Sequence, residues 1–146
     1  MTNGPTLKIM RLRPEARLPE RATEGASGLD LYACLPDGEI TLTPDPALVP
    51  TGVAIEIPQG YDAQVRPRSG LSLKGVGVAF GTIDSDYRGE VLVTMYVYGT
   101  RTEHVIAHGD RIAQLVIARL ADLPVVEADA LSDSARGARG HGSTGG

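Results

Sequence analysis

Proline and glycine recur so closely along this chain that they leave no room for a long helix. The 146 residues include 18 glycines and 10 prolines, and no window of a dozen residues free of both carries a helical hydrophobic period. Proline removes a backbone donor from a helix and glycine weakens it. Turn signals recur about every ten residues instead, which is typical of an all-β sandwich or jelly roll.

Short apolar or alternating runs between these turns predict β-strands. The expected strands lie at residues 7–12, 29–33, 39–42, 53–57, 61–67, 91–98, 104–107 and 111–118. The one helix expected is a turn or two at residues 69–74. We expect a single domain over residues 1–133, because a chain of this length forms one domain, and a flexible glycine-rich tail over 134–146.

Charge and cysteine content exclude several classes of protein. The formal net charge is −4, which argues against non-specific binding of nucleic acid through a basic surface. Cys34 is the only cysteine, so no internal disulfide or cysteine-cluster zinc site can form, and the simplest interpretation of Cys34 is an apolar core residue. No apolar run is long enough to span a bilayer and no leader is recognisable, so we expect a cytoplasmic protein that does not bind membranes.

The stretch that organises the chain is Gly-Thr-Ile-Asp-Ser-Asp-Tyr-Arg-Gly, at residues 81–89. A run of small and apolar residues precedes it and an alternating strand follows, so it is interpreted as a hairpin bend. Glycines at both ends permit tight turns and close approach to a ligand. Taken alone, the stretch fits either an ordinary hairpin with solvated charges or a small-molecule site built from Asp84 and Tyr87.

Two further segments place polar groups beside strand ends. Asp30 lies between two leucines and should point away from them, either to solvent or into a metal site. Residues 66–72 read Arg-Pro-Arg-Ser-Gly-Leu-Ser, where Pro67 ends a strand and Ser69 is a candidate N-cap of the short helix. That segment predicts either a plain capped turn or an anion site.

Two later segments are also candidates. Gln114 is a polar residue within an apolar strand, so its amide must bond either to neighbouring backbone or to a ligand. Residues 136–145 interleave glycines with arginine, serine and threonine. They are interpreted either as a disordered tail or as a loop that wraps phosphates with backbone N–H groups.

Together, in this order, the five segments resemble the five motifs of the trimeric dUTP diphosphatase (dUTPase) family. The motifs are Ser-Gly-Leu-Asp, Pro-Arg-Ser-Gly-Leu, Gly-x-Ile-Asp-x-x-Tyr-x-Gly, Arg-Ile-Ala-Gln-Leu and Gly-Ser-Thr-Gly. The resemblance implies a distorted jelly-roll (β-clip) protomer, a homotrimer with active sites shared between subunits, and Mg²⁺-dependent hydrolysis of dUTP to dUMP and pyrophosphate. Such an activity would keep uracil out of DNA and supply dUMP for thymidylate synthesis.

The resemblance also implies roles for single residues. Asp84 matches the carboxylate that activates the attacking water, Tyr87 the ring that packs under the deoxyribose, and Asp30 the motif-one aspartate near the metal, acting through water. The substrate-binding positions implied are Arg68, Ser69, Gly70, Gly81, Thr82, Ile83, Tyr87, Leu92, Gln114, Arg136, His141, Gly142, Ser143 and Thr144. Of these, residues 68–70 and Gln114 are implied for the phosphates and residues 81–83 and Leu92 for the base.

Two features depart from the family pattern, and both concern the base. Arg139 replaces a tail glycine, and His141 replaces the phenylalanine that stacks on uracil. The stretch between Leu71 and Gly81 is short and lacks an asparagine that many bacterial members place near the base.

Two rival interpretations come from other functional classes. A dCTP deaminase-like or bifunctional member of the same fold would release ammonia from dCTP. A non-catalytic nucleotide-sensing or partner-binding module would have no need of the water-activating carboxylate at Asp84.

Overall fold

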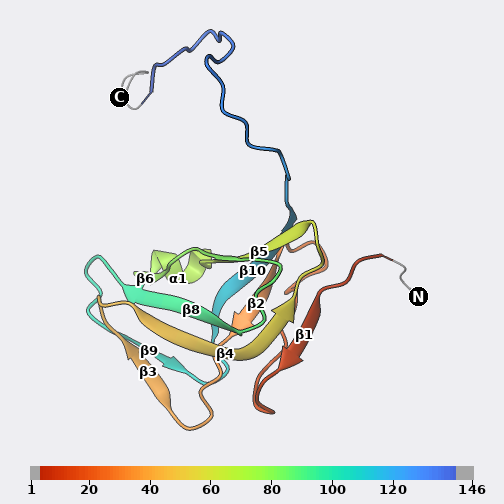
Figure 1. The fold of residues 1–146 in the computed structure, drawn as a ribbon. Helices are drawn as coiled ribbons and strands as arrows, with labels where there is room; N and C mark the ends of the chain where they lie inside the picture. The colour runs from red at the N-terminus through yellow and green to blue at the C-terminus, as the bar shows by residue number, and fades with distance from the viewer. Residues whose placement is uncertain (1–3, 141–146) are drawn as a thin grey trace.

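The protein is built from two four-stranded antiparallel sheets packed face to face, with a small third sheet beside them (Figure 1). The computed structural model describes residues 4–140. The first sheet has the order β1-β4-β8-β6, the second β2-β10-β5-β7, and the third pairs β3 with β9. The strands are β1 (Lys8–Arg11), β2 (Gly28–Tyr32), β3 (Glu39–Leu42), β4 (Ala47–Glu56), β5 (Tyr61–Arg66), β6 (Val76–Val78), β7 (Gly81–Ile83), β8 (Glu90–Val97), β9 (His104–Ala107) and β10 (Arg111–Arg119).

The expected all-β fold is therefore confirmed, with a single short helix, α1 (Ser69–Leu73), among the described residues. Strand β4 is longer than expected and begins at Ala47 rather than at residue 53. It includes Pro50, which lies next to the point where the register of β4 with β8 shifts. A proline is tolerated there, since the ladder is already interrupted. No helix within residues 4–140 is long and apolar enough to cross a membrane.

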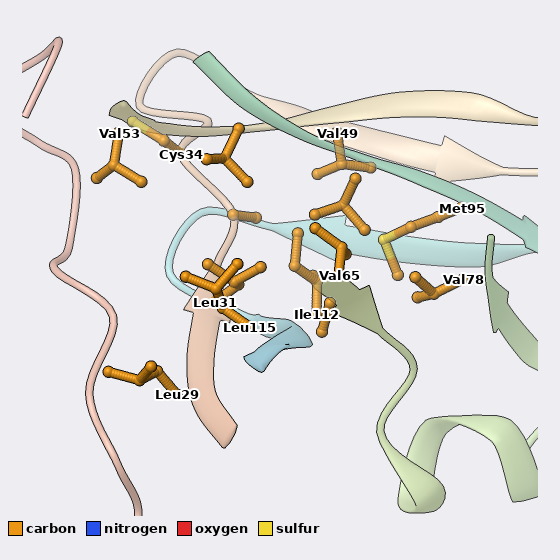
Figure 2. Packing of buried hydrophobic residues seen from close by; sticks show 14 of the residues in the cluster. Leu29, Leu31, Cys34, Val49, Val53, Val65, Val78, Met95, Ile112 and Leu115 are labelled. Carbon is orange, nitrogen blue, oxygen red and sulfur yellow. The ribbon is translucent and has the colours of Figure 1, made fainter. Parts of the chain in front are cut away.

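The core lies between the two large sheets. In Figure 2 the side chains of Val49 and Met95 on β4 and β8 face those of Leu31, Val65 and Leu115 on the opposite sheet. These five side chains are at most 3% exposed, and burying each contributes about 1.5–3 kcal/mol. Cys34 is buried in the same cluster, as expected for an apolar core residue.

After β10 the chain leaves the body of the protein. Residues 120–140 contain no helix or strand and are all exposed, and Figure 1 shows them running away from both sheets. The apolar side chains of Leu123, Val125 and Leu131 are 78%, 101% and 89% exposed. Such a segment has no packing partner within its own chain.

Candidate functional site

The first of two hollows that contain expected site residues lies where the chain passes from one sheet to the other. It has a volume of about 230 Å³. Its lining residues come from β5, β7, the loop at residues 84–89 and the start of β8: Val65, Gly81, Thr82, Ile83, Asp84, Tyr87, Glu90, Val91 and Leu92. The structure thus brings six of the expected site residues to one place. We call this hollow the β7–β8 pocket.

The strands that flank residues 81–89 pair antiparallel, as expected for a hairpin: β6 lies beside β8. The connection between them is not a simple bend, because it contains strand β7. Strand β7 pairs with β5, whereas β8 pairs with β4 and β6 in the other sheet. The strand within the bend was not expected, because the local sequence pattern cannot show that residues 81–83 will pair with β5. Since β7 is the last strand of its sheet, its outer backbone edge is free to meet a ligand in the pocket.

Asp84 and Tyr87 occupy the loop that crosses between the sheets. Asp84 is exposed, so its carboxylate is accessible to water and to a ligand. The backbone N–H of Tyr87 donates to the carbonyl of Asp84 at 3.1 Å, which closes a turn and places both residues at the same pocket.

The Tyr87 ring is held by the residues that follow it. Its hydroxyl donates to the backbone carbonyl of Glu90 at 2.8 Å. The ring also lies so close to Gly89 that a Cβ atom there would be 2.4 Å from the hydroxyl oxygen. Only glycine allows this approach, and the ring therefore keeps a fixed place in the pocket wall while 44% of Tyr87 stays exposed.

The second hollow is polar and lies beside β2, at the opposite edge of the sheet that contains β7. It has a volume of about 480 Å³ and is lined by Arg17, Glu20, Arg21, Ala22, Asp30, Tyr32, Gly109, Asp110 and Arg111. Asp30 lies between two guanidinium groups, with Arg68 and Arg111 each 3.7 Å from its carboxylate. We call these three side chains the Asp30 cluster.

The Asp30 cluster carries one negative and two positive charges. Asp30 points away from Leu29 and Leu31, which are buried, and its side chain is 14% exposed. Arg68 also donates to the backbone carbonyl of Arg111 at 3.5 Å. The surplus positive charge, in planar groups with several donors, suits a phosphate.

Arg111 was missed by the sequence analysis, although it lies in the same segment as Gln114. The signal was available only through strand pairing, since Arg111 stands opposite Tyr32 and Gln114 opposite Asp30 in the β10–β2 ladder. Burial raises the pKa of the neighbouring Tyr32 above its usual value.

Gln114 bonds to backbone within its own chain. Its Nε2 donates to the carbonyl of Pro67 at 3.0 Å, directly before Arg68. Gly28 makes room for this amide, because a Cβ there would be 2.4 Å from Oε1 of Gln114. This bond holds the chain that leads into Arg68.

Ser69 is not the N-cap of α1, contrary to expectation. The N-cap is Arg68, which has extended backbone angles and no side-chain capping bond, and Ser69 is the first helical residue. Because Ser69 already has helical backbone geometry, the helix begins one residue earlier than expected. Ser69 and Gly70 are exposed and directly follow Arg68 of the Asp30 cluster.

A single chain does not unite all the expected site residues. The β7–β8 pocket and the hollow beside Asp30 share no lining residue. Arg136 bonds to Arg139 in the extended tail, at neither hollow. His141, Gly142, Ser143 and Thr144 lie outside the described residues.

Comparison with known proteins decides the family. The model of the family described as dUTPase matches residues 14–145. The chain belongs to the dUTPase family.

Relatives that are similar to this chain along nearly their whole length are named as deoxyuridine 5'-triphosphate nucleotidohydrolases. A deoxyuridine 5'-triphosphate nucleotidohydrolase of Hydrogenobaculum sp. (strain Y04AAS1) is 50% identical over 142 residues, covering 95% of this chain and 97% of the relative. One from Rhizobium rhizogenes (strain K84 / ATCC BAA-868) is 48% identical, covering 97% and 94%.

Solved dUTPase structures share the fold. The dUTPase of Staphylococcus bacteriophage 80alpha, in a mutant form with dUpNHpp, has a TM-score of 0.84 at 28% identity and covers 99% of both chains. A mutant dUTPase of phage phi11 of S. aureus, described with coordination of a structural Mg(II) ion, has a TM-score of 0.76 at 26% identity, covering 86% of this chain and 97% of that one.

The residues of this dUTPase-family chain fit a magnesium ion that arrives with phosphates, and not a metal held by protein alone. Within residues 4–140 no three His, Cys, Asp or Glu side chains are grouped closely enough to hold a metal. Asp30 supplies a single carboxylate between two cations. Mg²⁺ commonly keeps several waters and binds substrate phosphates together with one or two carboxylates, which agrees with this donor set.

Proposed function

We propose that this member of the dUTPase family hydrolyses dUTP to dUMP and pyrophosphate, by attack of water on the α-phosphorus. The observation that carries the proposal is the β7–β8 pocket, which places an accessible carboxylate, a fixed tyrosine ring and a free strand edge together. The relatives that are 48–50% identical along nearly the whole chain support the same activity.

Asp84 is the general base in this proposal. Its carboxylate orients a water molecule and takes its proton as the water oxygen bonds to the α-phosphorus. The bond from that phosphorus to the oxygen bridging to the β-phosphorus breaks, and pyrophosphate leaves with the electron pair. A positioned base of this kind contributes roughly 10²–10⁴-fold to the rate.

Recognition of the nucleoside falls to the pocket wall. The free outer edge of β7 at residues 81–83, together with Leu92, offers backbone donors and acceptors to uracil. The Tyr87 ring packs under the deoxyribose, where a 2′-hydroxyl would meet it. Because the ring is fixed by Gly89 and the Glu90 carbonyl, it cannot easily move aside for a ribonucleotide.

The phosphates are bound by the second group of residues. Arg68, Ser69 and Gly70 provide the donors, and Gln114 lies at the α-phosphate. Asp30 would hold Mg²⁺ through water while the phosphates hold it directly, and the bound ion would neutralise charge on the triphosphate. The Asp30 carboxylate, 3.7 Å from Arg68, also holds the arginine of the phosphate site in place.

We further propose that each site is shared between subunits of a homotrimer. Two observations support this arrangement: the pocket and the Asp30 cluster occupy separate hollows of one chain, and the exposed apolar tail has no partner within that chain. The tail is then free to close a neighbour's site, with Arg136 and residues 141–144 on the phosphates and the base. A cytoplasmic location remains a prediction.

A panel of nucleoside triphosphates assayed for pyrophosphate release tests the proposed activity. With Mg²⁺ present, kcat/KM for dUTP should exceed that for UTP, dCTP and dTTP by on the order of 100-fold or more, the discrimination expected when a rigid site rejects a misplaced group. Ammonia release from dCTP, measured in the same samples, would favour the deaminase alternative. Absence of turnover with tight nucleotide binding would favour the sensing module and contradict the proposal.

A further inference from the structure

Glu90 is the most highly connected side chain near the β7–β8 pocket, yet no role has been assigned to it so far. Its Oε2 accepts a hydrogen bond from Arg13 Nη2 at 2.6 Å and one from the backbone N–H of Gly52 at 2.8 Å. Oε1 lies 3.5 Å from Arg13 Nη1, which makes the pair bidentate. The side chain of Glu90 is only 21% exposed, and its bond to Arg13 raises the pKa of that arginine above its usual value.

These contacts replace missing backbone pairing between β4 and β8. The register of the two strands shifts between Pro50, which pairs with Leu92, and Ala54, which pairs with Glu90, so the ladder is interrupted at Val91. The buried hydroxyl of Thr51 donates to the carbonyl of Val91 at 2.6 Å, and Gly52 donates to the Glu90 carboxylate. The start of β8 is therefore held by side chains in addition to the pairing of Glu90 with Ala54.

The backbone of Glu90 also carries the contact that matters for the pocket. Its carbonyl accepts the Tyr87 hydroxyl bond at 2.8 Å. A continuous path of short contacts thus runs from Arg13, through the Glu90 carboxylate and backbone, to the Tyr87 ring. Gly89 lies under the ring on the same segment, so any rotation of this segment would displace Tyr87.

We propose that Glu90 is a positioning residue for Tyr87, and that its ion pair with Arg13 sets how strictly the site rejects a 2′-hydroxyl. The inference rests on the proposed contact of Tyr87 with the deoxyribose. Glu90 acts through Tyr87 and not on the reacting atoms. When the ion pair is removed, the Glu90 carbonyl is less firmly held and the ring can move away from a ribose.

The test compares kcat/KM for dUTP and for UTP in Glu90→Gln and Arg13→Gln. Glu90→Gln keeps an oxygen for the Gly52 N–H but loses the charge that Arg13 binds. We expect the dUTP/UTP ratio to fall on the order of tenfold in both variants, since small misplacements of a binding group have effects of this size or larger. Arg13→Lys, which keeps the charge, should restore part of the ratio.

Further variants separate positioning from a loss of stability. Ile106→Val shortens a fully buried side chain of β9, which pairs only with β3, and should lower the melting temperature while leaving the ratio unchanged. Tyr87→Phe removes the hydroxyl that bonds to Glu90, so Glu90→Gln should have little further effect on the ratio in a Tyr87→Phe background.

The outcomes distinguish this inference from the proposal beneath it. A wild-type protein that hydrolyses UTP as well as dUTP would overturn the role of Tyr87 and this inference with it. Strong discrimination by the wild type, together with an unchanged ratio in both Glu90→Gln and Arg13→Gln, would overturn the inference alone and leave a purely structural ion pair.

Discussion

Replacing Asp84 by asparagine is expected to lower kcat for dUTP by roughly 10²–10⁴-fold, the contribution of a positioned general base. The dissociation constant of a non-hydrolysable dUTP analogue should stay nearly the same. The physical reason is that asparagine keeps the shape of the side chain but cannot take a proton from the attacking water. Single-turnover rates and calorimetric titration of the analogue measure the two quantities separately.

Asp86→Asn is the matched control for this substitution. Asp86 is an exposed carboxylate of the same loop, but it does not line the β7–β8 pocket. We expect its removal to change kcat less than about threefold, since an exposed side chain away from the chemistry contributes little. If Asp84→Asn weakened analogue binding as strongly as it slowed turnover, Asp84 would be a structural residue and not the base.

Truncation after Asp133 is expected to reduce kcat/KM for dUTP on the order of 100-fold or more, because a lid that completes a site and excludes water is removed. The fold should be unaffected. Among residues 4–140, the hydrogen bonds of Arg136, Gly137 and Arg139 all lie within the tail itself. Steady-state kinetics at several dUTP concentrations would measure the loss.

The melting temperature and the molar mass by light scattering provide the control for truncation. The melting temperature should match that of the full-length protein, and the molar mass should correspond to the same number of subunits. The reason is that residues 134–140, the described part of the removed segment, are exposed. A truncated protein with the activity of the full chain would show that the Gly-Ser-Thr-Gly tail takes no part in the site. A fall in activity accompanied by dissociation would instead assign the tail to assembly.

The local features of the fold were predictable from sequence, and the pairing of distant strands was not. Short apolar runs between turn signals placed β2 and β10 within one residue of their observed bounds, and Pro67 marked the end of β5. Residues 81–89 were interpreted as a hairpin bend, and the strands on either side of them, β6 and β8, do pair. The sequence did not show that β7 and β8 would separate. They belong to different sheets, a choice made by the whole core and not by the bend.

The site shows the same division between local and long-range information. The motifs identified Asp84 and Tyr87, and the structure places both at one pocket. Arg111 and Glu90 were not identified, because each is important through a contact that is distant in sequence. Arg111 contacts Asp30, 81 positions before it, and Glu90 contacts Arg13, 77 positions before it. Only the folded chain brings these charges together.

The central claim is that each active site combines the β7–β8 pocket of one subunit with the Arg68 segment of another. Mixing two inactive variants, Asp84→Asn and Arg68→Ala, tests it most directly. Each variant spoils one half of the site and leaves the other half intact. The mixed protein is prepared by refolding or co-expression, with molar mass measured to verify that both variants assemble.

If the halves come from different subunits, random mixing at equal amounts restores an intact pair in about a quarter of the sites of a cyclic oligomer. We predict that pyrophosphate release from dUTP recovers to about that fraction of the wild-type rate, because each intact site works with its own pocket and its own arginine. If Asp84 and Arg68 of the same chain served one site, every site would carry a defect. A mixture as inactive as its two components would therefore contradict the account.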